Sequence, residues 1–309
     1  MDFATLTKLC ADEEKAVELF EKWRWPNGPV CPHCGSHECY RLRSKPETTK
    51  KKSKLRPGVR KCKDCRQKFT AKMGTVFEDS HIPISKWLMA LHLLCASKKG
   101  MSSHQLHRML KVTYKTSWFM TMRIREAMRR EPLSSRLRGT VEVDETYVGG
   151  KFSGKRGRGA EHKVPVVSLV ERGGRARSFP VERVTSANLK AIIKENVSPT
   201  ADIITDDFMS YRGLSRDFAS HQTIAHSKDE WARGPVHTNT VEGFFSILKR
   251  GIIGTYHHTS THHLPRYLDE FDFRYNSRYY DDGERTIQAI EGAEGKRLMY
   301  REPARAATR

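Results

Sequence analysis

The sequence of 309 residues contains no apolar run long enough to cross a membrane. The best candidate, residues 87–96, is too short and contains His92. The residues after Met1 also lack the basic start and long apolar stretch of a secretory signal. Acidic residues are few relative to basic ones, with 36 Asp and Glu against 56 Lys and Arg. The formal net charge of +20 predicts a polyanionic partner, namely nucleic acid, and we expect a cytoplasmic protein with no membrane partner.

Cysteine is sparse and odd in number, which argues against a disulfide framework. Of the seven cysteines, four form two C-x-x-C pairs, Cys31 with Cys34 and Cys62 with Cys65. Four thiolates in two chelating turns are typical of a tetrahedral structural Zn²⁺ site, so we expect a zinc ribbon. Cys39, His33 and His37 lie nearby, but a complete shell of four sulfurs leaves them no place as ligands.

Lysine and arginine are concentrated between and beside the cysteine pairs. The segments 50–56 and 60–63 are strongly basic, which favours contact with DNA phosphates. The alternative is a solvated, mobile loop, and nothing in these residues indicates a preferred base sequence.

Helical periodicity dominates the first half of the chain outside the cysteine-bearing segment. It predicts helices over about 1–25, 84–96, 102–110 and 115–130. The last two are consistent with a helix-turn-helix, whose second helix would face the major groove. Candidate phosphate contacts on that helix are Lys115, Arg123, Arg125, Arg129 and Arg130.

From Gly139 onward the pattern changes to a mixed α/β order. It predicts strands over 140–148, 164–170, 176–184, 201–205 and 221–225, with helices over 187–196, from about 240, and over 262–280. This order fits a ribonuclease-H-like sheet, in which the first and fourth strands lie side by side. Acidic residues on those two strands would then meet, with the following helix across them.

Three carboxylates from distant segments are the candidate metal ligands. Asp144 lies near the end of the first strand, Asp206 ends the fourth, and Glu242 lies on the helix that follows. Asp207 is adjacent to Asp206 and remains an alternative second ligand. Hard oxygen ligands suit Mg²⁺ or Mn²⁺, and two such ions about 4 Å apart can promote displacement at phosphorus. Glu142 shares the strand face of Asp144, and Glu145 the opposite face.

Two further polar residues share the helical stripe of Glu242. Asn239 and Lys249 lie three residues before and seven residues after it, so all three project from one side of the helix. We expect Lys249 to neutralise a phosphate and Asn239 to bond DNA or a metal-bound water. His237 is a weaker candidate.

Taken together these motifs resemble the ISXO2-like DDE transposases, an insertion-sequence group (the IS1595 family). The resemblance covers nearly the whole chain. The matching segments are 31–34, 62–70, 74–80, 143–151, 205–206 with 210–213, 237–251, 254–258 and 267–276.

This resemblance implies a bacterial, nucleoid-associated enzyme with a ribonuclease-H-like catalytic domain that uses a divalent metal ion. It assigns the acidic triad to Asp144, Asp206 and Glu242, followed by Lys249; Asn239 remains an alternative third member. The implied reaction cuts DNA at the element ends and joins the 3′-hydroxyl to target DNA. The expected partners are double-stranded terminal inverted repeats, target DNA and further copies of the chain.

We therefore divide the chain into five segments with separate roles. These are an N-terminal helix (1–28), a zinc ribbon (29–80), a helical DNA-binding segment (81–135), the catalytic domain (138–285) and a basic tail (286–309). Two other functions fit the same residues: a DNA-binding regulator derived from a transposase, and a nuclease or junction resolvase of the same fold.

Overall fold

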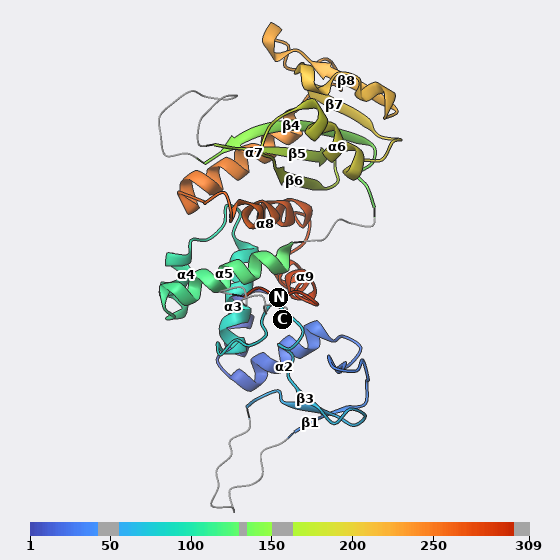
Figure 1. Cartoon of the computed structure of the whole chain (residues 1–309). Helices are drawn as coiled ribbons and strands as arrows, with labels where there is room; N and C mark the ends of the chain where they lie inside the picture. Colours follow the sequence, from blue (N-terminus) through green and yellow to red (C-terminus); the bar gives the residue numbers. More distant parts are fainter. Residues whose placement is uncertain (43–55, 130–134, 150–162, 300–309) are drawn as a thin grey trace, which may run out of the picture. The chain divides into compact units, whose positions relative to one another are not determined.

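A computed structural model describes residues 1–42, 56–129, 135–149 and 163–299 (Figure 1). The chain divides into two compact units, which are described separately. The first comprises Met1–Ser97, Ser103–Met128 and Tyr280–Arg309, and the second Lys98–Ser102 and Arg129–Tyr279. Among the described residues, no helix is both long enough and apolar enough to span a membrane.

The first unit begins with two helices, where the sequence predicted one. These are α1 (Phe3–Cys10) and α2 (Glu13–Arg24). The break occurs because Asp12 adopts an extended conformation and its side chain accepts a hydrogen bond from the backbone N–H of Glu14, which starts a new helix.

A small antiparallel sheet follows in the cysteine-bearing region. Its strands β1 (Cys39–Arg41), β2 (Arg60–Cys62) and β3 (Lys68–Phe69) pair in that order. Register places Cys39 opposite Cys62. The basic segment 50–55, for which we predict DNA contact, lies outside the described residues.

The helices predicted in the middle of the chain are present. They are α3 (Ile84–Ala96), α4 (Ser103–Leu110) and α5 (Tyr114–Met128). The hydroxyl of Ser117 donates to the backbone oxygen of Ser103, and this bond ties α5 to α4.

The first unit also contains α9 (Asp282–Glu291), which differs from the sequence prediction. We assigned 138–285 to the catalytic domain and 286–309 to a basic tail. Asp281 and Glu284 instead form a capping box that starts a helix packed against α3. We predicted no helix over these residues.

The second unit is built on a mixed sheet of the ribonuclease-H-like type. Its strands are β4 (Thr140–Val148), β5 (Val164–Glu171), β6 (Ala176–Pro180), β7 (Asp202–Asp206) and β8 (Ser220–Ile224), in the spatial order β6-β5-β4-β7-β8 (Figure 1). The first three strands are antiparallel, and β7 and β8 are parallel to β4. The predicted adjacency of the first and fourth strands is confirmed.

Helices cover both faces of this sheet. Alternate residues Val141 and Val143 of β4 share one apolar cluster with Leu189 and Ile193 of α6 (Ser186–Asn196). The intervening Glu142 contacts the start of α7 (Asn239–Gly251). Because successive strand side chains point to opposite faces, α6 and α7 lie on opposite sides of the sheet.

Short turns replace an α-helix between β7 and β8. They are the 3₁₀ turns η1 (Met209–Tyr211) and η2 (Leu214–Arg216), and a third, η3 (His226–Lys228), follows β8. The positive φ of Gly213 (87°), a conformation that favours glycine, separates the first two.

The last helix of the second unit, α8 (Leu264–Asn276), covers the edge strand β6. A π-helical turn, η4 (Ile252–Tyr256), leads from α7 toward it. The amide of Asn276 accepts from the N–H of Ala176 and donates to its carbonyl, and Asp272 accepts from the N–H of Ser178. These side chains form hydrogen bonds with backbone groups of β6 that would otherwise be free to pair with another strand.

Candidate functional site

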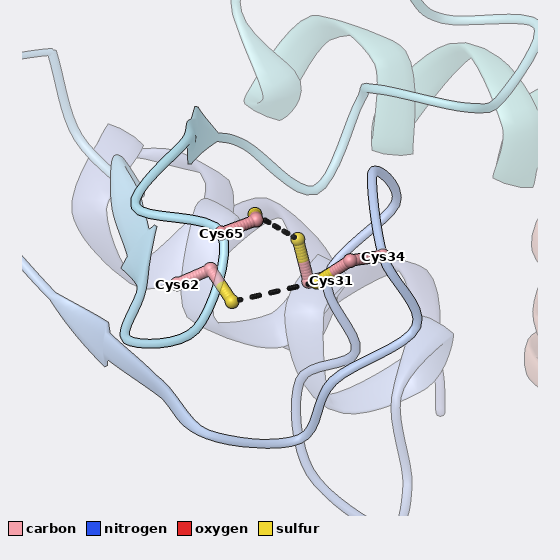
Figure 2. A group of neighbouring side chains, drawn as sticks. All are labelled: Cys31, Cys34, Cys62 and Cys65. Atoms are coloured by element: carbon pink, nitrogen blue, oxygen red, sulfur yellow. Dashed lines mark hydrogen bonds between the residues drawn. The ribbon is translucent and has the colours of Figure 1, made fainter.

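The four cysteines of the two C-x-x-C pairs converge in the first unit. Their four Sγ atoms all lie within 4.8 Å of one another, and the side chains point toward one another (Figure 2). The residues are Cys31, Cys34, Cys62 and Cys65. The Sγ–Sγ distances are 3.6 Å for Cys31–Cys65 and 3.7 Å for Cys34–Cys62. Tetrahedral zinc with bonds of about 2.3 Å needs sulfurs about 3.8 Å apart, so the cluster fits the ion.

Within the cluster, the pKa of one thiol is lowered, while the neighbouring thiols raise the pKa values of Cys34 and Cys65. Burial raises the pKa of the Cys62 thiol, but hydrogen bonds from the backbone of Cys65 and Asp64 and from neighbouring thiols outweigh it and lower the pKa to about 6. The thiol of Cys39 packs against the cluster and interacts with Cys62, but it is not one of the four grouped sulfurs and donates to the carbonyl oxygen of Ser36 at 3.4 Å. His33 Nε2 lies 3.4 Å from the carbonyl oxygen of Lys68. Neither belongs to the group of four.

In the second unit the structure brings Asp144 and Asp206 together. The parallel pairing of β4 with β7 joins Glu142 to Ile204, so the same register continued by two residues sets Asp144 beside Asp206. Their carboxylates, with that of Glu145, each place an oxygen within 4.8 Å of the other two. Such a group of oxygens suits a hard divalent cation.

The acidic group is held in place by local hydrogen bonds. The N–H of Glu145 donates to Asp144 Oδ1 at 2.7 Å, and the N–H of Phe208 donates to Asp206 Oδ1 at 3.1 Å. Asp207 is exposed, and its carboxylate accepts from the hydroxyl of Ser227 instead. The geometry therefore favours Asp206 over Asp207 as the residue directed at Asp144.

Glu145 was not among the sequence-predicted ligands, because strand alternation places it on the face opposite Asp144. The structure also places Glu145 on the face covered by α6. There the hydroxyl of Tyr211, which belongs to the same apolar cluster as α6, donates to Glu145 Oε2 at 2.7 Å. The carboxylate nevertheless joins the acidic group, at the point where β7 ends at Asp206. The sequence feature that could have identified Glu145 as a candidate ligand is its position next to Asp144.

Asp144 carries the clearest electrostatic signature in this unit. Burial raises its pKa most, and the neighbouring carboxylates of Glu145, Asp206 and Glu242 raise it further, to about 8. The hydrogen bond from the Glu145 N–H opposes this only in part. Because like charges crowd one site, the group favours either a proton or a cation.

Glu242 lies in the first turn of α7, beside the acidic group but not within it. Its Oε1 accepts from the hydroxyl of Thr238 at 2.7 Å, and His226 Nε2 lies 3.5 Å away. Its side chain is 45% exposed. Its charge raises the pKa of Asp144, by less than the charges of Glu145 and Asp206 do. Of the predicted triad, the structure thus brings Asp144 and Asp206 into one group of carboxylates and leaves Glu242 outside it.

The other residues predicted on α7 are arranged as the helical stripe requires. Asn239, Glu242 and Lys249 are all exposed, and Lys249 lies in the last turn. His237 precedes the helix, with Nδ1 3.0 Å from Arg172 Nη2 and 3.4 Å from Glu142 Oε1.

Glu142 anchors this helix and is a residue whose role the sequence did not reveal. It is fully buried, and its carboxylate accepts hydrogen bonds from the backbone N–H groups of Thr240 and Val241, at 2.7 and 3.0 Å. Arg172 Nε donates to its other oxygen at 2.6 Å. A carboxylate at a helix N-terminus also interacts favourably with the helix dipole.

Two of the predicted DNA contacts in the helical segment are contradicted by the structure. Arg125 is fully buried, and Arg123 is almost fully buried with Nη1 donating to the carbonyl oxygen of Glu78 at 2.9 Å. Both face the interior because α5 is packed on more than one side, which amphipathic periodicity did not reveal. Lys115 and Arg129 are exposed, and Arg130 lies outside the described residues.

Two family models match the chain over the regions that contain these groups. The transposase zinc-ribbon domain matches residues 11–68, and the ISXO2-like transposase domain matches residues 136–276. The first match includes all four clustered cysteines, and the second includes the acidic group and α7.

Two curated relatives were found. An uncharacterised protein in transposable element ISH50 of Halobacterium salinarum is 30% identical over 285 residues, covering 86% of this chain and 92% of the relative. An uncharacterised transposase-like protein of Haemophilus influenzae is 33% identical over 97 residues, covering 31% of this chain and 77% of the relative.

Solved structures resemble the chain more weakly. They include a simian T-cell lymphotropic virus intasome in complex with a PP2A regulatory subunit (16% identity, TM-score 0.29, 54% of this chain and 67% of that chain). A Mos1 strand transfer complex also matches (16% identity, TM-score 0.27, 66% and 73%). With two family models and a relative that aligns over nearly its whole length, the chain belongs to the ISXO2-like transposase family.

Proposed function

We propose that this transposase cuts DNA at the ends of its element and joins the resulting 3′-hydroxyl to target DNA, at the site formed by Asp144, Asp206 and Glu242. One observation carries the proposal. A ribonuclease-H-like sheet sets Asp144 beside Asp206 in one group of carboxylates, in a chain of net charge +20, and the charge of Glu242 on α7 acts on Asp144.

The donor set fits Mg²⁺ or Mn²⁺, whose contribution would be to activate the attacking oxygen and to stabilise the leaving one. Asp144 and Asp206 would hold the ion, with Glu145 and Glu242 as the neighbouring carboxylates. The high pKa of Asp144 fits this role, because a cation replaces the proton that the crowded carboxylates otherwise retain.

The exposed stripe of α7 supplies the contacts to DNA. Lys249 neutralises a backbone phosphate, and Asn239, at the start of the helix, hydrogen-bonds the substrate. Zinc held by the four cysteines fixes the ribbon, which binds the terminal inverted repeats together with the helical segment. Because two element ends must be held together, the active form is a homo-oligomer on nucleoid DNA in the bacterial cytoplasm.

Strand transfer with Mg²⁺ tests the assignment. Asp144→Asn, Asp206→Asn and Glu242→Gln should each reduce cleavage and joining by about a thousandfold or more, since each removes charge that the reaction requires. DNA binding should persist. Asp207→Asn is the matched control, because its carboxylate bonds Ser227 and should leave activity within a few-fold.

The same assay separates the other functions. Cleavage without joining would favour a nuclease or resolvase, and sequence-specific binding without cleavage would favour a regulator. Full activity in all three acidic variants would contradict the proposed site.

A further inference from the structure

Trp231 is unusual among the five tryptophans of the chain, all of which lie in described segments. It is 62% exposed, whereas Trp23, Trp25, Trp87 and Trp118 are buried or half-buried. A large aromatic ring in water forgoes the stabilisation that burial gives, so an exposed indole offers an apolar face that a ligand can cover.

The segment that carries Trp231 is held by its own hydrogen bonds. The N–H of Ala225 donates to Glu230 Oε2 at 3.1 Å, and the N–H of Glu230 donates to the Ala225 carbonyl oxygen at 3.2 Å. On the other side, Arg233 and Val236 exchange backbone hydrogen bonds of 2.9 and 3.1 Å. The ring therefore projects from a turn that is fixed on both sides.

Two side-chain contacts connect the ring to Glu242, through His226. The Trp231 ring lies 5.1 Å from that of His226, centroid to centroid. His226 Nε2 is in turn 3.2 Å from the hydroxyl of Thr238 and 3.5 Å from Glu242 Oε1. One side chain, that of His226, thus separates the exposed ring from Glu242, the carboxylate that we propose as the third member of the acidic site.

We propose that Trp231 is a stacking platform for an unpaired nucleobase of the DNA held at the acidic site. This inference rests on the proposed function. Bases within a duplex already stack on their neighbours, so an exposed indole gains most from a base at a strand end or one displaced from its pair. The basic surplus of the chain favours nucleic acid over an apolar protein partner for the same ring.

Binding to DNA of two shapes tests the platform without requiring cleavage. The probes are a blunt duplex and the same duplex with a short single-stranded overhang that contains 2-aminopurine. Affinity is measured by anisotropy with the full chain and Ca²⁺, and stacking by quenching of the 2-aminopurine fluorescence.

Trp231→Ala should weaken binding to the overhang duplex by between about 5-fold and 150-fold, the range for loss of one base–aromatic stack, and should abolish the quenching. Trp231→Phe should retain most of both, and affinity for the blunt duplex should change little. Tyr279→Ala, which removes another exposed aromatic ring, should leave both probes unaffected.

Equal binding by Trp231→Ala and the unmodified protein would overturn the platform, as would equal losses in the Ala and Phe variants. A change in sedimentation with no change in DNA binding would instead identify Trp231 as a contact between copies of the chain, and would also reject the proposal. None of these results depends on catalysis, so the platform can fail while the acidic site stands. Conversely, activity that survives the acidic substitutions rejects only the proposed reaction centre.

Discussion

Glu142 holds Thr240 at the start of α7 through two hydrogen bonds, from the backbone N–H at 2.7 Å and from the hydroxyl at 2.8 Å. Glu142 is a residue of the strand that carries Asp144, and Thr240 lies two residues before Glu242. The pair therefore connects the two elements on which the acidic residues lie. This link sets the position of Glu242 relative to Asp144.

Replacing Glu142 by Gln should destabilise the protein by about 3 kcal/mol, because Arg172 and the N-terminus of α7 lose a buried charged partner. Thr240→Val, which keeps the shape and removes the hydroxyl, should cost about 1 kcal/mol. Urea denaturation of both variants and of the double variant measures their coupling. We expect the double variant to be more stable than the sum of the single losses predicts. Simple additivity would show that the two side chains are not energetically coupled.

Metal-free protein should lose stability as the pH rises, through Asp144. Its pKa in the fold is about 8, above the unfolded value of 3.8, so ionisation opposes folding. The sign follows directly: the penalty is absent below about pH 4, grows between pH 4 and 8, and is then constant. Asp144→Asn lacks this penalty and should therefore gain stability relative to the unmodified protein with rising pH.

Thermal unfolding without added divalent cation, at pH 5 and pH 8, measures this difference. It should be of order 1–3 kcal/mol at pH 8 and smaller at pH 5, at 1.36 kcal/mol per pKa unit and discounted for solvent screening. Added Mg²⁺ should stabilise the unmodified protein more at pH 8, since the ion must displace the Asp144 proton. A difference that is independent of pH would contradict the raised pKa.

The adjacency of Asp144 and Asp206 was predictable because it depends on two strong signals. Alternation identified the first strand, a short apolar run identified the fourth, and the order of elements brought them side by side in parallel. The C-x-x-C pairs were equally informative, because their spacing alone restricts the geometry of four sulfurs.

Other features depend on tertiary packing that a one-dimensional pattern does not contain. Glu145 reaches the acidic group because β7 ends beside it, and strand alternation says nothing about where a neighbouring strand stops. Glu142 was recognised as sharing a face with Asp144, but its bonds to Thr240 require knowing that α7 begins over that face. From the sequence alone, a carboxylate that anchors a helix and a carboxylate that binds a metal ion look the same on an apolar strand.

Zinc should depend on Cys34 and not on Cys39. Cys34→Ser removes one of four clustered sulfurs, so the variant should lose its equivalent of zinc and the fold of the ribbon with it. Cys39→Ser alters a thiol that bonds the Ser36 carbonyl oxygen outside the cluster, and it should retain zinc. Zinc content by elemental analysis after gel filtration checks both, and retention in Cys34→Ser or loss in Cys39→Ser would exclude a four-cysteine site.

Arg125 and Lys115 of α5 should respond to substitution in opposite ways, although both are basic. Arg125 is fully buried, so Arg125→Ala should lower the free energy of unfolding by about 2 kcal/mol or more, through a cavity and unpaired polar neighbours. Lys115 is exposed, so Lys115→Ala should leave stability within about 0.5 kcal/mol. If the helical segment binds DNA, the same variant should reduce the slope of log affinity against log salt by about one, because one phosphate contact is lost. Arg125→Ala should leave that slope unchanged at temperatures where it remains folded, and a reduced slope there would mean that the buried guanidinium reaches DNA after all.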